Sequence, residues 1–452
     1  MADGAGGDER FRPQRVGFAP DGADVRRVEA FRSAHRRVSF GSACRREVVC
    51  RTLEVLAHGF PRGGTVDIEL AGRVTLATRD AVGAVLGEIY AALYGRLGLR
   101  GNLFAFSELS AVDPELWDLV YDRPRVRLGW LARELASCGD DAALEEIAAG
   151  STAFQGLRTI AEGGLWPHIV LPATRTNVRL LPEMVPALLE VTRGASIDIV
   201  PAPFVPSMPG AEAPAPDDYT EAVLALYRNR AVPLRLVSPL SWVAARMNSQ
   251  VPLVRSAASA GAEIAVTPNG DLYVGEFGVG IERWRIGNVL QASGSVLTFS
   301  TGTERKMAER GAGLTPTLHW ERLDAAPESF SNAMQPERCQ TCDWRYRCGG
   351  LDASVFQLEE RRRLAAERGS VGTAAAALER IEAWPEGETA GDDGDWPDLA
   401  ELYCAPRKAL FEEMLWDCAE SAAQRQAAKP RERLELSDEG IAYVPVAGEA
   451  EG

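Results

Sequence analysis

The chain has 452 residues and is 46% hydrophobic, which is enough for one large domain and a smaller one, each with its own core. Its formal net charge of −15 argues against partners with phosphate backbones and against anionic membranes. Residues 1–13 are polar and Gly-rich, which predicts disorder and provides no apolar run for a signal peptide. No stretch reaches the roughly 20 apolar residues of a membrane span. We therefore expect a cytoplasmic protein that binds neither nucleic acid nor membrane.

Strands and helices are predicted to alternate from residue 14 to residue 240, because the hydrophobic spacing changes repeatedly along this stretch. The predicted strands are 15–18, 66–70, 103–106, 126–130, part of 166–173, 197–201 and 233–237. The predicted helices are 42–58, 79–97, 114–121, 141–149, 152–163, 180–191 and 220–229. This alternation predicts an α/β fold in which parallel βα units close, wholly or in part, into a barrel.

The pattern changes after residue 240. Residues 262–273 predict a β-hairpin that turns at Pro268-Asn-Gly-Asp, and residues 297–311 predict a helix. An insertion at about 355–400 begins with a charged helix and ends in an acidic loop. We predict that residues 241–425 form a small second domain and that residues 426–452 form a loose tail.

Four cysteines are spaced as metal ligands. Residues 339–352 read Cys-Gln-Thr-Cys-Asp-Trp-Arg-Tyr-Arg-Cys-Gly-Gly-Leu-Asp, so Cys339 and Cys342 bring two thiolates onto one turn and Cys348 adds a third. Cys404, on a helix predicted to run to about residue 429, can complete the set. Four thiolates suit a zinc ion or an iron–sulfur cluster equally well, and the alternative is a set of buried structural cysteines. The four histidines do not pair at ligand spacing, so the sequence gives little support to a histidine metal site or a Ser–His triad.

The cysteine block and the later Cys-x2-Arg-Lys-x-Leu-Phe at Cys404 resemble the SPASM domain of radical SAM peptide maturases. That family has a fourth block cysteine where this chain has Asp352. The resemblance covers about residues 14–425. It implies a partial (β/α)6-type radical SAM-like barrel over residues 14–240 and a small α+β SPASM-like metal-binding domain over residues 241–425.

The resemblance also shows what this chain lacks. Active family members carry Cys-x3-Cys-x2-Cys after the first strand, and these thiolates hold the cluster that binds S-adenosylmethionine. The corresponding positions here are Ala23, Arg27 and Ala30. The family's Gly-Gly-Glu-Pro segment corresponds to residues 71–76, where Arg73 replaces the carboxylate that helps to hold the amino group of S-adenosylmethionine. An arginine would repel that ammonium group.

The auxiliary-cluster ligands implied by the resemblance divide in the same way. The positions of the first auxiliary cluster carry other residues, namely Gly275, Asp352 and either Ser256 or Ser259. The ligands of the second auxiliary cluster are all present, namely Cys339, Cys342, Cys348 and Cys404. Two clusters have lost their ligands and one has kept them, so the retained set is predicted to be one real site.

This partition predicts a catalytically silent member of the family. We expect an adaptor that binds an active radical SAM maturase, a ribosomally made precursor peptide, or both, and that retains one 4Fe-4S cluster without the cluster that binds S-adenosylmethionine. A zinc-stapled binding module is the first alternative. The second is an enzyme with other chemistry at the barrel mouth, where Asp67, Glu69, Glu108 and Arg73 could lie, although solvated rim residues are the simpler interpretation.

Overall fold

The structure is a computed structural model. It describes residues 35–40, 46–59, 65–70, 103–107, 126–164, 166–205, 208, 212–248, 263–291, 339, 341–344, 348, 351, 353–368, 398–428, 432–437 and 440–445. The predicted disorder of residues 1–13, the strand 15–18 and the helices 79–97, 114–121 and 297–311 lie outside these residues.

Ten strands form one sheet in the order β10-β9-β8-β1-β2-β3-β4-β5-β6-β7. They are β1 (His35–Phe40), β2 (Thr65–Leu70), β3 (Leu103–Ser107), β4 (Val126–Leu131), β5 (His168–Ala173), β6 (Ser196–Pro201), β7 (Val237–Ser238), β8 (Glu263–Val266), β9 (Asp271–Val274) and β10 (Arg285–Asn288). The strands from β1 to β7 pair in parallel and in chain order. Strand β8 adds in parallel beside β1, and β9 and β10 continue the sheet antiparallel. Among the described residues β7 and β10 are the two edges of the sheet, so the sheet is not closed on itself.

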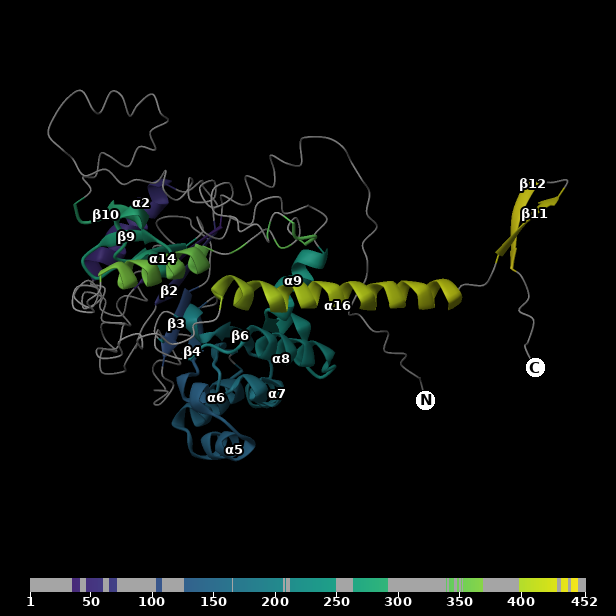
Figure 1. Ribbon diagram of the computed structural model, residues 1–452, viewed down its shortest axis with the longest axis horizontal. Coiled ribbons are helices and arrows are strands. Elements are labelled where there is room, and N and C mark those ends of the chain that lie inside the picture. The colour runs from purple at the N-terminus through teal and green to yellow at the C-terminus, as the bar shows by residue number, and fades with distance from the viewer. Residues whose placement is uncertain are drawn as a thin grey trace, which may run out of the picture.

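Helices connect the strands and cover the sheet (Figure 1). The α-helices are α2 (Arg46–Gly59), α5 (Asp141–Gly150), α6 (Thr152–Glu162), α7 (Leu181–Thr192), α8 (Pro216–Arg228), α9 (Leu240–Asn248), α14 (Ala353–Arg368) and α16 (Leu399–Ala428). Short 3-10 turns are η3 (Arg133–Ser137), η4 (Val178–Leu180), η5 (Ala202–Phe204), η6 (Leu234–Leu236), η9 (Glu276–Gly278) and η10 (Glu282–Trp284). None of the described helices is both long enough and apolar enough to cross a membrane.

Two contacts show how the helices pack on the sheet. The ring of Trp130 in β4 meets Phe154 of α6 edge to face, with centroids 5.9 Å apart. The buried hydroxyl of Tyr219 in α8 donates a hydrogen bond to the carbonyl oxygen of Ile199 in β6, at 3.0 Å. Every second residue of β6, including Ile197 and Ile199, is buried, as expected for a strand with one face under helices.

The predicted strand 233–237 is shorter in the structure than in the sequence analysis. Residues 234–236 form the turn η6, and β7 has only Val237 and Ser238. Pro233 and Pro239 flank this segment, and neither has an N–H to donate to a strand ladder. The segment therefore pairs with β6 over only two positions.

The second part of the chain is built around β8, β9 and α14. The predicted hairpin is present, and its turn includes Gly270 at a φ of +86°, a conformation that favours glycine. Helix α14 was expected to be an inserted helix with one weak apolar face, but Val355 and Phe356 are buried in the common core. Because of these contacts, α14 is part of the domain's core.

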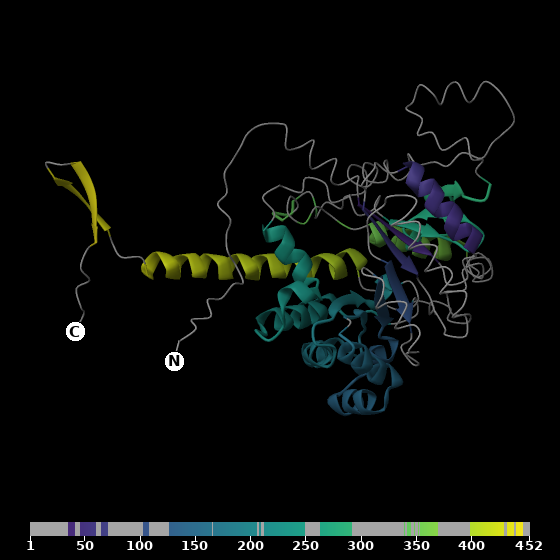
Figure 2. The same ribbon diagram turned by 180° about the vertical axis from the view of Figure 1, so that it is seen from behind.

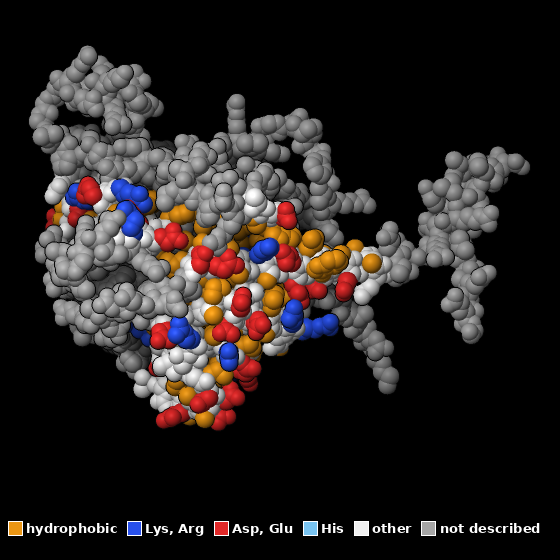
Figure 3. Space-filling model, in the orientation of Figure 1, with side chains coloured by type: hydrophobic (Ala, Val, Ile, Leu, Met, Phe, Trp, Pro, Cys, Tyr) orange, Lys and Arg blue, Asp and Glu red, His pale blue; other side chains and the backbone are white. Residues whose placement is uncertain are grey.

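Helix α16 leaves the body of the molecule in both ribbon views (Figures 1 and 2). Hydrophobic side chains gather on the helix where it emerges (Figure 3), and Leu415 and Trp416 are exposed on it. Strands β11 (Glu432–Ser437) and β12 (Gly440–Pro445) then form an antiparallel hairpin. This hairpin is regular structure within the segment that was predicted to be a loose tail.

Candidate metal centre

The structure brings together three of the four predicted ligands. The thiol of Cys404, on α16, forms a hydrogen bond with Cys339 and lies close enough to Cys348 to interact with it electrostatically. Cys339 is buried in the core, and Cys348 and Cys404 are half-buried against it. The backbone N–H of Cys348 donates to the carbonyl oxygen of Trp344 at 2.7 Å, which forms a tight turn within the cysteine block.

Cys342 is the fourth predicted ligand. It is half-buried and is not among the groups that act on the thiol of Cys404. Within the part of the chain that the structure describes, no three His, Cys, Asp or Glu side chains are grouped as a metal site. The three thiols are therefore neighbours that are not arranged at ligand spacing.

The pKa of Cys404 is raised well above the ordinary value for a thiol. The largest cause is its hydrogen bond with Cys339, and burial and the neighbouring Cys348 and Cys339 act in the same direction. In this form Cys404 is a protonated thiol. A soft metal would bind Cys404 as its thiolate, with the proton released to the solvent.

An arginine lies beside these thiols on the next turn of α16. The Nη1 of Arg407 donates to the carbonyl oxygen of Tyr403 at 2.6 Å, and its guanidinium lies over the ring of Tyr403, 3.6 Å from the centroid. The Nε of Arg407 is buried and has no hydrogen-bond partner among the described residues. The desolvation cost of this buried cation must therefore be offset by the charges and dipoles around it.

The groups around Arg407 favour its cation. Burial lowers the pKa of Arg407, but Tyr403, Tyr219, Cys348 and Cys404 raise it, and the net pKa is above the ordinary value. Among the described residues no carboxylate forms an ion pair with Arg407.

The chemistry of the donor set and this cation suits a thiolate-bound metal centre, although the thiols do not lie at ligand spacing in this structure. Four thiolates around a zinc ion, or around an oxidised 4Fe-4S core, leave a net charge of about −2. Arg407 supplies a buried positive charge and an unused N–H beside two of the four thiols. The predicted ligands Cys339, Cys342, Cys348 and Cys404 therefore suit either group chemically.

Aromatic contacts connect the cysteine block to the barrel through α16. Phe411 of α16 stacks on Trp344 of the block, with ring centroids 5.0 Å apart and an interplanar angle of 12°. The same Phe411 meets Trp242 of α9 edge to face at 6.2 Å. Farther along the helix, Arg228 of α8 donates from Nε to Glu413 at 2.8 Å. Helix α16 thus contacts both parts of the chain.

The position that the resemblance assigns to a ligand of the first auxiliary cluster is enclosed by another side chain. Gly275 has a φ of +67°, and a Cβ built on it would lie 2.8 Å from Oε1 of Gln357. Gln357 is buried, and its Nε2 donates to the carbonyl oxygen of Val274 at 2.6 Å. A cysteine at position 275 would need both a strained backbone and the space that Gln357 fills, so α14 closes over this position.

Further polar contacts hold α14 on the same loop. Arg361 donates hydrogen bonds to the carbonyl oxygens of Phe277 and Val279, and burial lowers its pKa to about 10. Glu360 is buried, accepts a hydrogen bond from Nε1 of Trp284 at 2.8 Å and pairs with Arg283. The sequence analysis missed this network because these residues look like the solvated face of a charged helix.

Several other predicted positions lie outside the described residues. These are Ala23, Arg27, Ala30, Arg73, Glu108, Ser256, Ser259 and Asp352. Asp67 and Glu69 belong to β2, and only their backbone is described. The chemistry of the barrel mouth therefore stays a prediction from the sequence.

A histidine cluster lies elsewhere in the barrel. Nδ1 of His168 is 2.9 Å from Oγ of Ser196, and its Nε2 is 3.4 Å from Oδ2 of Asp198. Sequence spacing gives little support to such a group, because 28 residues separate His168 from Ser196, but the parallel pairing of β5 and β6 places the two residues side by side. His168 and Ser196 begin their strands, at the end of the barrel opposite to the one where barrel enzymes place their active sites.

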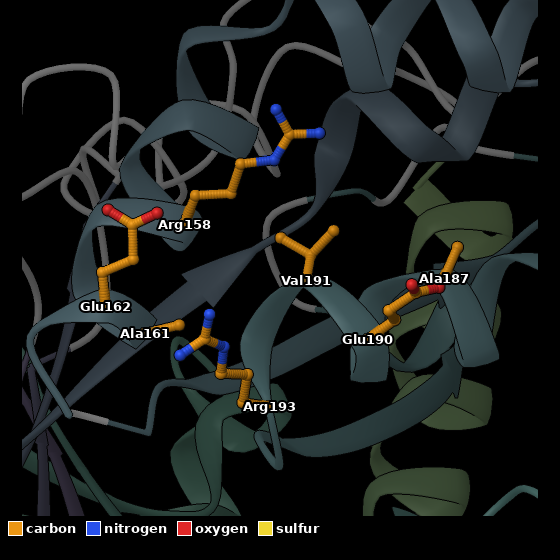
Figure 4. Close-up of a pocket in the computed structure, with 7 residues that line it drawn as sticks. All are labelled: Arg158, Ala161, Glu162, Ala187, Glu190, Val191 and Arg193. Atoms are coloured by element: carbon orange, nitrogen blue, oxygen red, sulfur yellow. The ribbon is translucent and has the colours of Figure 1, made fainter.

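An open groove runs between α6 and α7 (Figure 4). It is lined by Arg158, Ala161, Glu162, Ala187, Glu190, Val191 and Arg193. None of the predicted site residues is among them, and its two arginines and two glutamates are exposed.

No family model and no curated protein matches this chain. Solved structures do match. anSMEcpe with bound AdoMet is 12% identical with a TM-score of 0.50, and the match covers 86% of this chain and 99% of that chain. anSMEcpe with bound AdoMet and Kp18Cys peptide is 13% identical, with the same TM-score and coverage. SuiB of Streptococcus suis bound to S-adenosylmethionine has a TM-score of 0.44 at 10% identity and covers 74% of this chain and 77% of that chain.

These neighbours are radical SAM maturases of the SPASM type, the family that the cysteine pattern resembles. At such low identity the likeness to anSMEcpe shows the fold alone. The predicted fold class, a partial radical SAM-like barrel followed by a small α+β domain, is confirmed.

Proposed function

We propose that this chain is a catalytically silent relative of radical SAM–SPASM peptide maturases that acts as an adaptor in ribosomal peptide modification. It would bind an active maturase, a precursor peptide, or both, in the cytoplasm. Its one metal centre would be a 4Fe-4S cluster held by Cys339, Cys342, Cys348 and Cys404, with zinc as the alternative.

The observation that carries this proposal is the contrast between two ligand positions. Cys339, Cys348 and Cys404 lie together beside the buried cation of Arg407. By contrast, the space beside Gly275 is filled by Gln357. One site would have kept a complete set of soft donors, whereas the other would have been rebuilt with protein groups. The resemblance places the ligands of the cluster that would bind S-adenosylmethionine at Ala23, Arg27 and Ala30, but these positions precede β1, which pairs directly with β2, so the loss of that cluster is proposed from the sequence alone.

Peptide binding is proposed from the fold. anSMEcpe has been solved with both AdoMet and the Kp18Cys peptide, and this chain shares its fold over 86% of its length. A scaffold that has lost its reactive centre can still bind a peptide, because binding uses the shape and polarity of the barrel. The retained centre would then act mainly as a structural staple that fastens the cysteine block to α16.

The first experiment measures iron, sulfide and zinc in anaerobically purified protein. We expect about four irons and four sulfides per chain, lost in Cys339→Ala and Cys404→Ala. Cys418→Ala is the matched control, because Cys418 is also half-buried on α16 but lies outside the predicted set. About one zinc without sulfide would identify the zinc-stapled module. Metal-free protein would refute the centre.

A second experiment tests the silent role. The reduced, reconstituted protein is incubated with S-adenosylmethionine, and we expect no 5′-deoxyadenosine. Purified chain is then added to a radical SAM maturase and its precursor peptide from the same source, with binding and turnover measured. We expect binding to at least one of them. Cleavage of S-adenosylmethionine by this chain alone would overturn the proposal.

A further inference from the structure

We propose that Arg407 is a positioning residue for the metal centre, and that its buried charge and its Nε–H hold the anionic, metal-bound form of the cysteines. This inference rests on the proposed centre and names a residue outside the ligand set. Arg407 is three residues after Cys404 on α16, so its side chain is close to that ligand on the same side of the helix.

Arg407 lacks a carboxylate counter-ion in the part of the chain that the structure describes. Among the described residues no carboxylate pairs with Arg407, and its ionisable neighbours are two tyrosines and two cysteines. A buried cation is costly unless an anion or several hydrogen bonds offset its desolvation. When bound to a metal, the sulfurs of Cys348 and Cys404 would carry negative charge and would supply this cation with an anionic partner.

The Nε–H of Arg407 is a hydrogen-bond donor without an acceptor among the described residues. Nη1 of Arg407 is held by the carbonyl oxygen of Tyr403, and the rings of Tyr403 and Trp242 lie 3.6 and 5.1 Å from the guanidinium carbon. These contacts fix the guanidinium and leave Nε buried without an acceptor among the described residues. Metal-bound sulfur accepts hydrogen bonds, and such bonds tune the affinity and the potential of thiolate-bound centres.

Arg407 also belongs to the interface between the two parts of the chain. Trp242, under the guanidinium of Arg407, is on α9, and Tyr219, which interacts with it electrostatically as the cysteines do, is on α8. A metal centre that stabilises the cation therefore also stabilises the docking of α16 on the barrel. Metal binding and docking should be coupled through this one side chain.

The test compares Arg407→Lys, which keeps the charge without the Nε–H, with Arg407→Met, which removes both. Metal retention is measured against a chelator, and melting temperature is measured with and without the bound metal. We expect Arg407→Met to weaken retention by about 10–100-fold and Arg407→Lys to restore part of it. We also expect Arg407→Met to lower the melting temperature more in the metal-loaded protein than in the metal-free protein.

The control is Arg228→Met, which removes an arginine that joins α8 to α16 at Glu413, away from the cysteines. If the centre is a cluster, loss of the positive charge in Arg407→Met should disfavour its reduction. The equilibrium constant for reduction should fall about tenfold, which lowers the midpoint potential by ~59 mV for one electron. If Arg407→Met does not fold, metal retention is compared between Arg407→Lys and Arg228→Met instead.

The outcomes separate this inference from the proposed function. A wild-type protein without metal would refute the centre, and with it the role of Arg407. Metal-loaded wild type with Arg407 variants that behave like Arg228→Met would leave the centre standing and overturn the inference alone. Equal melting losses with and without metal would likewise reduce Arg407 to a packing role.

Discussion

The substitution Gly275→Ala adds one methyl group and tests whether Gln357 fills the space beside position 275. In Gly275→Ala, an L residue must adopt a φ of +67°, which costs ~1–2 kcal/mol. The new Cβ would also lie 2.8 Å from Oε1 of Gln357, so the amide must move and weaken its 2.6 Å bond to the carbonyl oxygen of Val274. A disturbed buried hydrogen bond costs a further ~1–3 kcal/mol. The expected destabilisation is therefore ~2–5 kcal/mol.

Thermal and urea unfolding measure this loss, and Gly280→Ala is the matched control. Gly280 has a φ of +83° in the same loop, but no atom lies within 4 Å of the position that its new methyl group would take, so only the backbone cost remains. The double variant Gly275→Ala/Gln357→Ala should lose less than the sum of its parts, because the smaller side chain makes room for the methyl group. Equal losses in Gly275→Ala and Gly280→Ala would refute the steric reasoning and reopen position 275 to a metal ligand.

Two further predictions concern charged side chains that pack against α14 and α16. Glu360→Ala should destabilise the protein by ~1–3 kcal/mol, because it removes the acceptor of the Nε1–H of Trp284, whereas Glu412→Ala, at an exposed position of α16, should stay within ~0.5 kcal/mol in the same unfolding assay. The hydrogen bond from Arg228 lowers the pKa of Glu413, so this pair stabilises the fold above the ordinary glutamate pKa of ~4.3 and the effect is lost as pH falls through the lowered pKa. Glu413→Gln should therefore cost ~0.2–1 kcal/mol at neutral pH and nothing at strongly acid pH, and a constant difference across pH would contradict the assignment.

Most strands of the barrel could be predicted because their signals are local, although β1 (His35–Phe40) was not among the predicted strands. The hydrophobic spacing places β6 and α7 within one or two residues of their observed bounds, since one face of each is buried by its neighbours. The predicted strand 233–237 is longer than β7. Its apolar residues favour a strand, but the flanking prolines cannot donate hydrogen bonds to a neighbouring strand. The hairpin β11–β12 was missed because it follows a polar stretch.

The candidate site divides along the same line. Cysteine spacing singled out Cys339, Cys342, Cys348 and Cys404, and the structure places three of them close together, whereas their binding of a metal stays a prediction. Arg407 and Gln357 could not be assigned roles in this way. The role of Gln357 depends on the carbonyl oxygen of Val274, 83 residues away in the chain, and the surroundings of Arg407 include Tyr219 and Trp242 of the barrel. Hydrophobic periodicity says nothing about such contacts.

The different fates that we propose for the two auxiliary sites follow from where each one lies. Position 275 is enclosed by β9, η9 and α14, which are close-packed and hydrogen-bonded without any metal. Losing a ligand there costs little once Gln357 and Arg361 satisfy the loop carbonyls. The retained cysteines instead connect the cysteine block to α16, which contacts the barrel. On our proposal, a metal there supplies folding free energy that packing alone does not, and for this reason one site is kept after the chemistry has gone.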